Sequence, residues 1–160
     1  MGISKKELIN ISNKILTGSL SDLGYQFSAK GFSSNGFFYY KNDIEKNIYY
    51  IIEMQLSGFN NSDIFDIYVN IARSGNINSR IPDNIESFVE KYILRLGDWI
   101  YLDRKKVKTA QWKWHFQTAE EAETIFNEIF PLLQTYAIPF LENPSSSKKD
   151  YIRTLRNRTK

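Results

Sequence analysis

The chain has 160 residues, with 21 Lys and Arg, 18 Asp and Glu, one His and no Cys. This length fits one domain that buries its core without disulfides. The absence of Cys excludes thiol nucleophiles and zinc–thiolate sites, and a single His excludes a His-based metal cluster, so we expect no metal and no cofactor. The longest apolar run, Ile48 to Ile52, is too short to cross a membrane. We expect a soluble, cytoplasmic protein with no membrane partner.

Most of the positive charge lies at the C-terminus. Residues 148–160 hold six basic groups and one acid, which leaves 15 basic and 17 acidic groups in residues 1–147. A Pro- and Ser-containing stretch precedes this basic segment and has the composition of a linker or loop. The sequence therefore predicts a single domain over 1–143, followed by a basic tail or frayed helix over 144–160.

The first predicted element is a helix that begins at Ser4, because Glu7 stands three residues on and completes a capping box. Apolar residues then recur at helical spacing up to Leu16, and Gly24 is a natural stop. A hairpin follows, since the aromatic runs 27–32 and 37–41 flank an Asn-Gly pair.

Two longer strands are predicted over 48–57 and 64–73. In each strand, apolar and polar side chains alternate, as in a sheet with one buried face. If the strands pair antiparallel, burying both apolar sets together places both polar sets on the opposite face.

The middle of the chain allows two interpretations. A helical period runs from Ile85 to Leu96, but residues 92–102 are rich in strand-forming side chains, so we expect a short helix over 84–90 running into a strand. After a charged turn over 103–109, alternation predicts a final strand over 112–116. The last helix begins at Thr118 and should end at Ile138-Pro139.

These elements predict an α+β fold, with an antiparallel sheet of about five strands in chain order and the N-terminal and C-terminal helices packed on one face.

Several short blocks, in this order and spacing, resemble a bacterial family catalogued as domain of unknown function 4304. The blocks are Leu23-Gly24-Tyr25, Ile51-Ile52-Glu53-Met54-Gln55, Ile67-Tyr68-Val69-Asn70, Leu94-Arg95-Leu96-Gly97, Gln111-Trp112-Lys113-Trp114 and Tyr136-Ala137-Ile138-Pro139-Phe140-Leu141. The resemblance implies an α+β domain without an established activity, and Gln55, Asn70 and Arg95 match residues of the family pattern. Lys113 separates two tryptophans that the family has adjacent, which departs from that pattern.

The main candidate site is the polar face of the predicted sheet, where amide and phenol groups offer both donors and acceptors. Its residues are Glu53, Gln55, Asp66, Tyr68, Asn70 and Arg95. Within it, Glu53 and Asp66 could act as an acid–base pair if they lie a few Å apart, although polar groups are also expected on any solvated sheet face.

A second candidate is an aromatic platform for nucleic acid, formed by Trp112 and Trp114 beside the basic cluster 104–108. Alternating aromatic residues are also typical of a core strand. We expect His115 to be a surface or cap residue.

The sequence favours a non-enzymatic binding or protein-interaction module, of an immunity-type or regulatory kind, and assigns no catalytic residue. The alternative is a nucleic-acid binder that uses the basic tail and the 104–108 cluster, and an orphan hydrolase ranks last.

Overall fold

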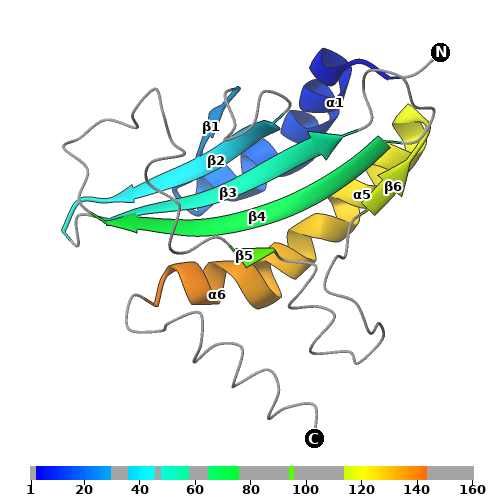
Figure 1. Ribbon diagram of the computed structural model, residues 1–160. Helices are drawn as coiled ribbons and strands as arrows, with labels where there is room; N and C mark the ends of the chain where they lie inside the picture. Colours follow the sequence, from blue (N-terminus) through cyan, green and yellow to red (C-terminus); the bar gives the residue numbers. More distant parts are fainter. Residues whose placement is uncertain are drawn as a thin grey trace, which may run out of the picture.

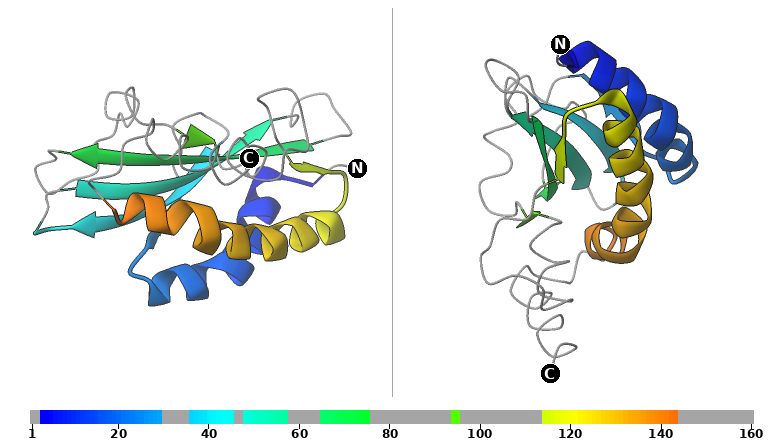
Figure 2. Two further views of the ribbon diagram at one scale, coloured as in Figure 1. Left: turned by 90° about the horizontal axis from the view of Figure 1, so that it is seen from below. Right: turned by 90° about the vertical axis from the view of Figure 1, so that its right-hand side faces the viewer.

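The computed structural model describes residues 3–29, 36–45, 48–57, 65–75, 94–95 and 114–143. In these residues an antiparallel sheet is covered on one face by two long helices, one from each end of the chain (Figures 1 and 2). The predicted α+β class and the one-sided placement of the helices are confirmed. No helix in this part of the chain is long and apolar enough to cross a membrane.

The N-terminal helix consists of α1 (Lys5–Ser12), a π-helical turn η1 (Asn13–Thr17) and α2 (Gly18–Asp22). It begins at Ser4, whose hydroxyl accepts a hydrogen bond from the Glu7 N–H at 3.1 Å. It ends before Gly24, which has a φ of 91°. Glycine is favoured there because the left-handed conformation strains residues that have a Cβ.

The C-terminal helix consists of α5 (Ala119–Leu132), a second π-helical turn η2 (Leu133–Ala137) and α6 (Ile138–Leu141). The predicted end at Ile138-Pro139 is wrong, because the helix continues to Leu141. The Ile138 N–H bonds to the Leu133 carbonyl, and Pro139 then lies in the first turn of α6, where its missing N–H is tolerated.

Both π turns are explained by the spacing of the buried residues. Leu8, Ser12, Leu16 and Leu20 are fully buried at four-residue intervals, and so are Ile129, Leu133, Ala137 and Leu141. In a regular α-helix each four-residue step drifts about 40° around the axis, so three steps would carry the last residue off the buried face. A wider π turn inside each helix compensates for this drift and keeps every fourth residue facing the sheet.

The sheet has six strands in the described residues. They are β1 (Gln26–Ser28), β2 (Gly36–Asp43), β3 (Ile48–Ser57), β4 (Phe65–Gly75), β5 (Leu94–Arg95) and β6 (Trp114–Phe116). The order β1-β2-β3-β4-β5 follows the chain, as predicted, but β6 does not extend it. Instead β6 pairs with the start of β4, on Phe65 to Ile67, while β5 pairs with β4 at Asn70 and Ile71.

Other predictions concern residues outside the described ranges. These are the hairpin turn, the helix over 84–90, most of the strand over 92–102, the turn over 103–109 and the tail over 144–160.

The main core lies between the helices and the inner face of the sheet. Tyr50, Ile52 and Met54 of β3 are fully or nearly fully buried there with the apolar stripes of both helices. The outer face of the sheet is also shielded, since Phe38, Tyr49, Ile51 and Ala72 are at most 4% exposed and lie outside the main core cluster. The centre of the sheet is therefore buried on both sides.

Candidate functional site

The strand register brings the polar residues of the outer face into three neighbouring rows. In the first row, Glu53 pairs with Asn70, and the backbone of Asn70 pairs with Arg95 on its other side. The second row is Gln55 with Tyr68, and the third is Ser57, Asp66 and His115. Paired residues share a face, and residues two apart on a strand also do. We call the seven of these residues whose side chains the structure describes, all except Arg95, the polar stripe.

The buried end of the polar stripe is a side-chain hydrogen-bond network centred on Asn70. Its Nδ2 donates to Glu53 Oε1 at 2.8 Å and to Gln55 Oε1 at 2.9 Å. Glu53 is 1% exposed and Asn70 is 5% exposed. Both N–H bonds of the Asn70 amide are thus used, and its orientation is fixed because both partner atoms are oxygen acceptors.

The same orientation leaves one acceptor of Asn70 unused. Its Oδ1 is buried and has no hydrogen-bond partner among the described residues. A buried carbonyl without a partner costs free energy. The Asn70 side chain is therefore held in place by its donor end, while its acceptor end has bonding capacity to spare.

Gln55 connects this buried network to the surface. Its side chain is half-buried, and Asn70 holds its Oε1, which fixes the amide plane. The two hydrogens on Nε2 stay as donors, and they make no hydrogen bond to another residue in the part of the chain that the structure describes. The buried end of the stripe thus positions a donor group close to solvent.

The exposed end of the polar stripe holds two ionisable side chains, Asp66 and His115. His115 Nδ1 lies 2.5 Å from Asp66 Oδ1, and the Ser57 hydroxyl donates to Asp66 Oδ2 at 3.4 Å, which is long for such a bond. The Asp66 side chain is 16% exposed and the His115 side chain 58%. Because Nδ1 bonds to the carboxylate, the imidazole is oriented and Nε2 is the nitrogen left for a ligand.

His115 and Ser57 are the members of this site that sequence reasoning missed. The alternation of residues 114–116 shows that His115 faces away from Trp114 and Phe116, and this signal is visible in the sequence. The sequence does not show that His115 lies opposite Asp66. The strands β4 and β6 are joined by a long stretch of chain, and their register is set by tertiary structure.

The structure does not form the predicted acid–base pair. Asp66 is opposite Ser57, which is four residues along β3 from Glu53. At 3.2–3.4 Å per residue this separates Glu53 from Asp66 by about 13 Å along the strand. The third row does not form a nucleophilic triad either, because the carboxylate lies between serine and histidine, so His115 does not reach the Ser57 hydroxyl as a base.

Of the two tryptophans in the predicted aromatic platform, the structure describes Trp114, and that side chain is buried. Trp114 is 7% exposed and Phe116 1%, and both belong to the main core. The core interpretation is therefore correct for these residues, and Trp114 has no free face on which a base could stack. Trp112, the basic cluster 104–108 and the tail lie outside the described residues.

Within the described residues, no three His, Asp or Glu side chains gather where they could bind one metal ion. Comparison of the chain with protein-family models, with curated proteins and with solved structures found no match.

Proposed function

We propose that this protein is a non-enzymatic binding module that recognises a protein partner through the exposed half of the polar stripe, in the manner of an immunity or regulatory protein. The observation that carries the proposal is the double hydrogen bond from Asn70, which fixes Gln55 at the edge of the buried network. A side chain that is ordered before binding loses little conformational entropy when a partner arrives.

Two groups would make the principal contacts. Gln55 offers the N–H donors of its amide, and His115 offers Nε2 from an imidazole that Asp66 already orients. A complementary partner would place a carbonyl or carboxylate oxygen on Gln55 and a polar group on His115. Such pre-positioned polar groups give specificity, because a partner that lacks the matching group leaves them unpaired.

On the basis of the sequence blocks given above, we also propose a bacterial, cytoplasmic protein related to the family of unknown function 4304. The resemblance brings no activity with it. It adds one coincidence that supports the proposed site, since Gln55 and Asn70 belong both to the family pattern and to the polar stripe.

The test is affinity capture of the tagged chain from its source cells, followed by reconstitution with the purified partner. Gln55→Ala and His115→Ala should each weaken binding about tenfold or more, as expected for central interface residues that cost more than 1 kcal/mol on truncation. Asn127→Ala is the matched control, because within the described residues this exposed side-chain amide on α5 bonds only to the Glu123 carbonyl of its own helix. The control should bind with unchanged affinity.

A nucleic-acid binder would give a different result. Its partner would be nucleic acid, its affinity would fall steeply with salt, and deleting residues 148–160 would abolish binding while Gln55→Ala would not. That outcome would replace the proposal. Equal binding by all three single variants to a purified protein partner would refute the site.

A further inference from the structure

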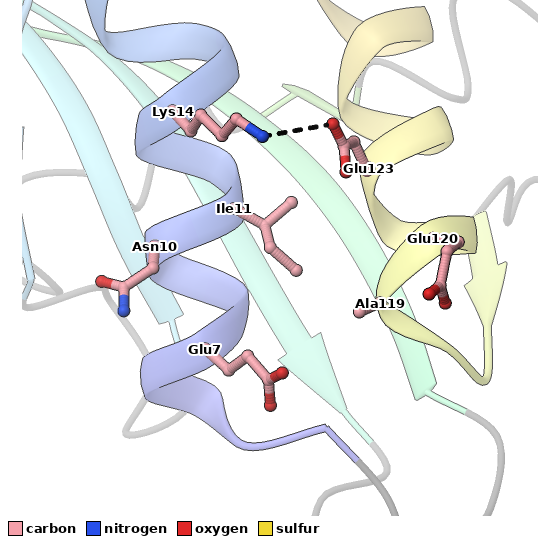
Figure 3. Close-up of a pocket in the computed structure, with 7 residues that line it drawn as sticks. All are labelled: Glu7, Asn10, Ile11, Lys14, Ala119, Glu120 and Glu123. Carbon is pink, nitrogen blue, oxygen red and sulfur yellow. Dashed lines mark ion pairs between the residues drawn. The ribbon is translucent and has the colours of Figure 1, made fainter.

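The two helices that cover the sheet leave an open groove of about 280 Å³ between them (Figure 3). It lies between α1 with its π turn and the first two turns of α5. The residues that line it are Glu7, Asn10, Ile11, Lys14, Ala119, Glu120 and Glu123. This groove is separate from the polar stripe, because the helices and the stripe are on opposite faces of the sheet.

The groove has an apolar floor and an acidic rim. Ile11 and Ala119 are half-buried at its base, and three carboxylates stand around them. One cation, Lys14, is among the described residues that line the groove, and its Nζ lies 3.6 Å from Glu123 Oε1. The other two carboxylates, one on each helix, have no ion-pair partner in the described part of the chain. The lining therefore carries a net charge of −2 from three Glu and one Lys.

The acidic character continues along the helix that leads from the groove to the basic tail. Residues 119–143 hold five glutamates and no Lys or Arg, and all five glutamates are exposed. They are Glu120, Glu121, Glu123, Glu128 and Glu142. Residues 148–160 hold six basic groups and one acid. A tail that turns back along this helix therefore runs beside charges of the opposite sign on its way to the groove.

The tail is long enough to arrive at the groove. Glu123 precedes Leu141 by 18 residues of continuous helix, about 27 Å. At about 3.4 Å per residue, an extended segment over 144–151 covers that distance. Residues 152–160 are therefore within reach of the groove, and they contain four basic groups, no acid and two large apolar residues.

We propose that the groove binds residues 152–160 of its own chain. The proposed contacts pair the basic side chains with the carboxylates of the rim, and place Ile152 and Leu155 on the apolar floor. The covalent attachment selects the chain's own tail over a second copy, because a short flexible tether gives an effective concentration in the millimolar range. A second copy would have to reach a similar concentration to compete. The bound tail joins α1 to α5, since the rim contains carboxylates of both helices.

The absence of cysteine allows a direct test of this contact. In the full chain, Asn10→Cys places one thiol in the groove and Thr154→Cys places one in the tail, and we call this variant the groove pair. Under mild oxidation it should form an intramolecular disulfide at a rate that does not depend on protein concentration. High salt should slow the reaction several-fold, because it screens the attraction between tail and rim.

The matched control carries Thr135→Cys and Thr154→Cys. Thr135 is exposed on η2, nearer to the start of the tail than the groove is, so an undocked tail would link to it more readily. At low salt the groove pair should cross-link several-fold faster than this control. Faster cross-linking of the control would overturn the proposal.

The same chain distinguishes the two sources of the tail. Disulfide-linked dimers of the groove pair, with a yield that rises with protein concentration, would assign the groove to a second copy and overturn the proposal. Sedimentation velocity of the unmodified full chain gives an independent measurement. The chain should be monomeric at micromolar concentration, and a dimer that high salt dissociates would count against binding within one molecule.

Charge reversal tests the pairing of the rim with the tail. Adding Glu120→Lys and Glu123→Lys to the groove pair should slow cross-linking several-fold at low salt, because the rim then repels the tail. Adding Arg153→Glu and Arg156→Glu to that variant should restore the rate, since the charges are again opposite. A combined variant that stayed slow would refute the proposed pairing.

The control for net charge is the groove pair with Asp22→Lys and Glu45→Lys. These substitutions make the same change in net charge at exposed positions that do not line the groove. They should leave the rate of cross-linking within about twofold of that of the groove pair, as expected for isolated surface charges. Slowing equal to that of the rim variant would show that net charge alone controls the reaction, and the proposal would fail.

Discussion

The side-chain amide of Asn70 on β4 donates a hydrogen bond of 2.8 Å to the Glu53 carboxylate on β3, and the two residues are register partners that are almost fully buried. A carboxylate in such a place needs donors, because removing it from water is costly unless hydrogen bonds replace the lost solvation. The carboxamide at position 70 therefore has a structural role that its alternation in the sequence does not reveal.

The first prediction concerns this bond. Asn70→Ala should lower the free energy of unfolding by about 1–3 kcal/mol, since Glu53 and Gln55 each lose a donor. Urea unfolding at neutral pH measures the change. Asn127→Ala on the exposed side of α5 should stay within about 0.5 kcal/mol of the unmodified chain. If Asn70→Ala kept full stability and only abolished partner binding, Asn70 would serve recognition alone.

Two buried tyrosines should respond in opposite directions to loss of the hydroxyl. The Tyr39 hydroxyl donates to Asn13 Oδ1 and lies 2.9 Å from the Ser12 hydroxyl, so Tyr39→Phe should cost about 1–2 kcal/mol. The Tyr25 hydroxyl is buried without a partner among the described residues, so Tyr25→Phe should be neutral or stabilise the fold by up to about 1 kcal/mol. Chemical denaturation of both variants makes the comparison. Equal losses would show that the Tyr25 hydroxyl is bonded.

The raised pKa values of the same two tyrosines should make the free energy of unfolding fall at alkaline pH. Burial raises the pKa of Tyr25, with a further rise from the Glu142 charge, and burial also raises the pKa of Tyr39, against a smaller opposing effect of its hydrogen bond to Ser12. The unfolded chain loses these protons near the ordinary pKa of 10.0, whereas the folded chain retains them. Their contribution is constant well below that pH and falls above it by at most about 1.4 kcal/mol per pH unit for each tyrosine, until the pH reaches the folded-state pKa of that tyrosine.

Urea midpoints measured from about pH 9 to about pH 11 follow this decline. Tyr25→Phe and Tyr39→Phe should each make the decline shallower, because each removes one titrating group. A slope that neither substitution changes would assign the alkaline sensitivity to other groups.

Two glycines form a further matched pair. Gly18 has helical dihedral angles, and a Cβ there would meet nothing within 4 Å, so Gly18→Ala should stabilise the N-terminal helix by about 0.5–1 kcal/mol. Gly24 has a φ of 91°, and a Cβ there would lie 3.2 Å from Lys41 Cε, so Gly24→Ala should cost about 1–2 kcal/mol. Thermal unfolding of the two variants should shift in opposite directions, and a shared direction would contradict the backbone argument.

Local patterns predicted most of the fold. The alternation in 48–57 and 64–73 identified the two central strands and their faces, and the capping residues Ser4 and Thr118 located the two helix starts. These signals succeed because they depend on neighbours in the chain. Pro139 shows the limit of such rules, because its effect depends on the π turn before it, and that turn arises from packing against the sheet.

The candidate site was less predictable. Alternation placed Glu53 and Asn70 on the outer face, but it does not reveal whether a face is solvated, and both residues are buried. The contact between Asp66 and His115 joins residues 49 positions apart, so no local pattern contains it. Sequence reasoning thus found which residues share a face and missed which of them bond to one another.

The π turns also determine how these helices tolerate a change in length. Removing one residue from η1 would let the helix close into regular α turns with Leu8 and Leu20 eleven residues apart. Eleven residues at about 100° each bring the two side chains to within about 20° of one another around the axis, so Leu8 would still face the sheet. The π turn η1 is therefore the place where the N-terminal helix should tolerate the loss of one residue.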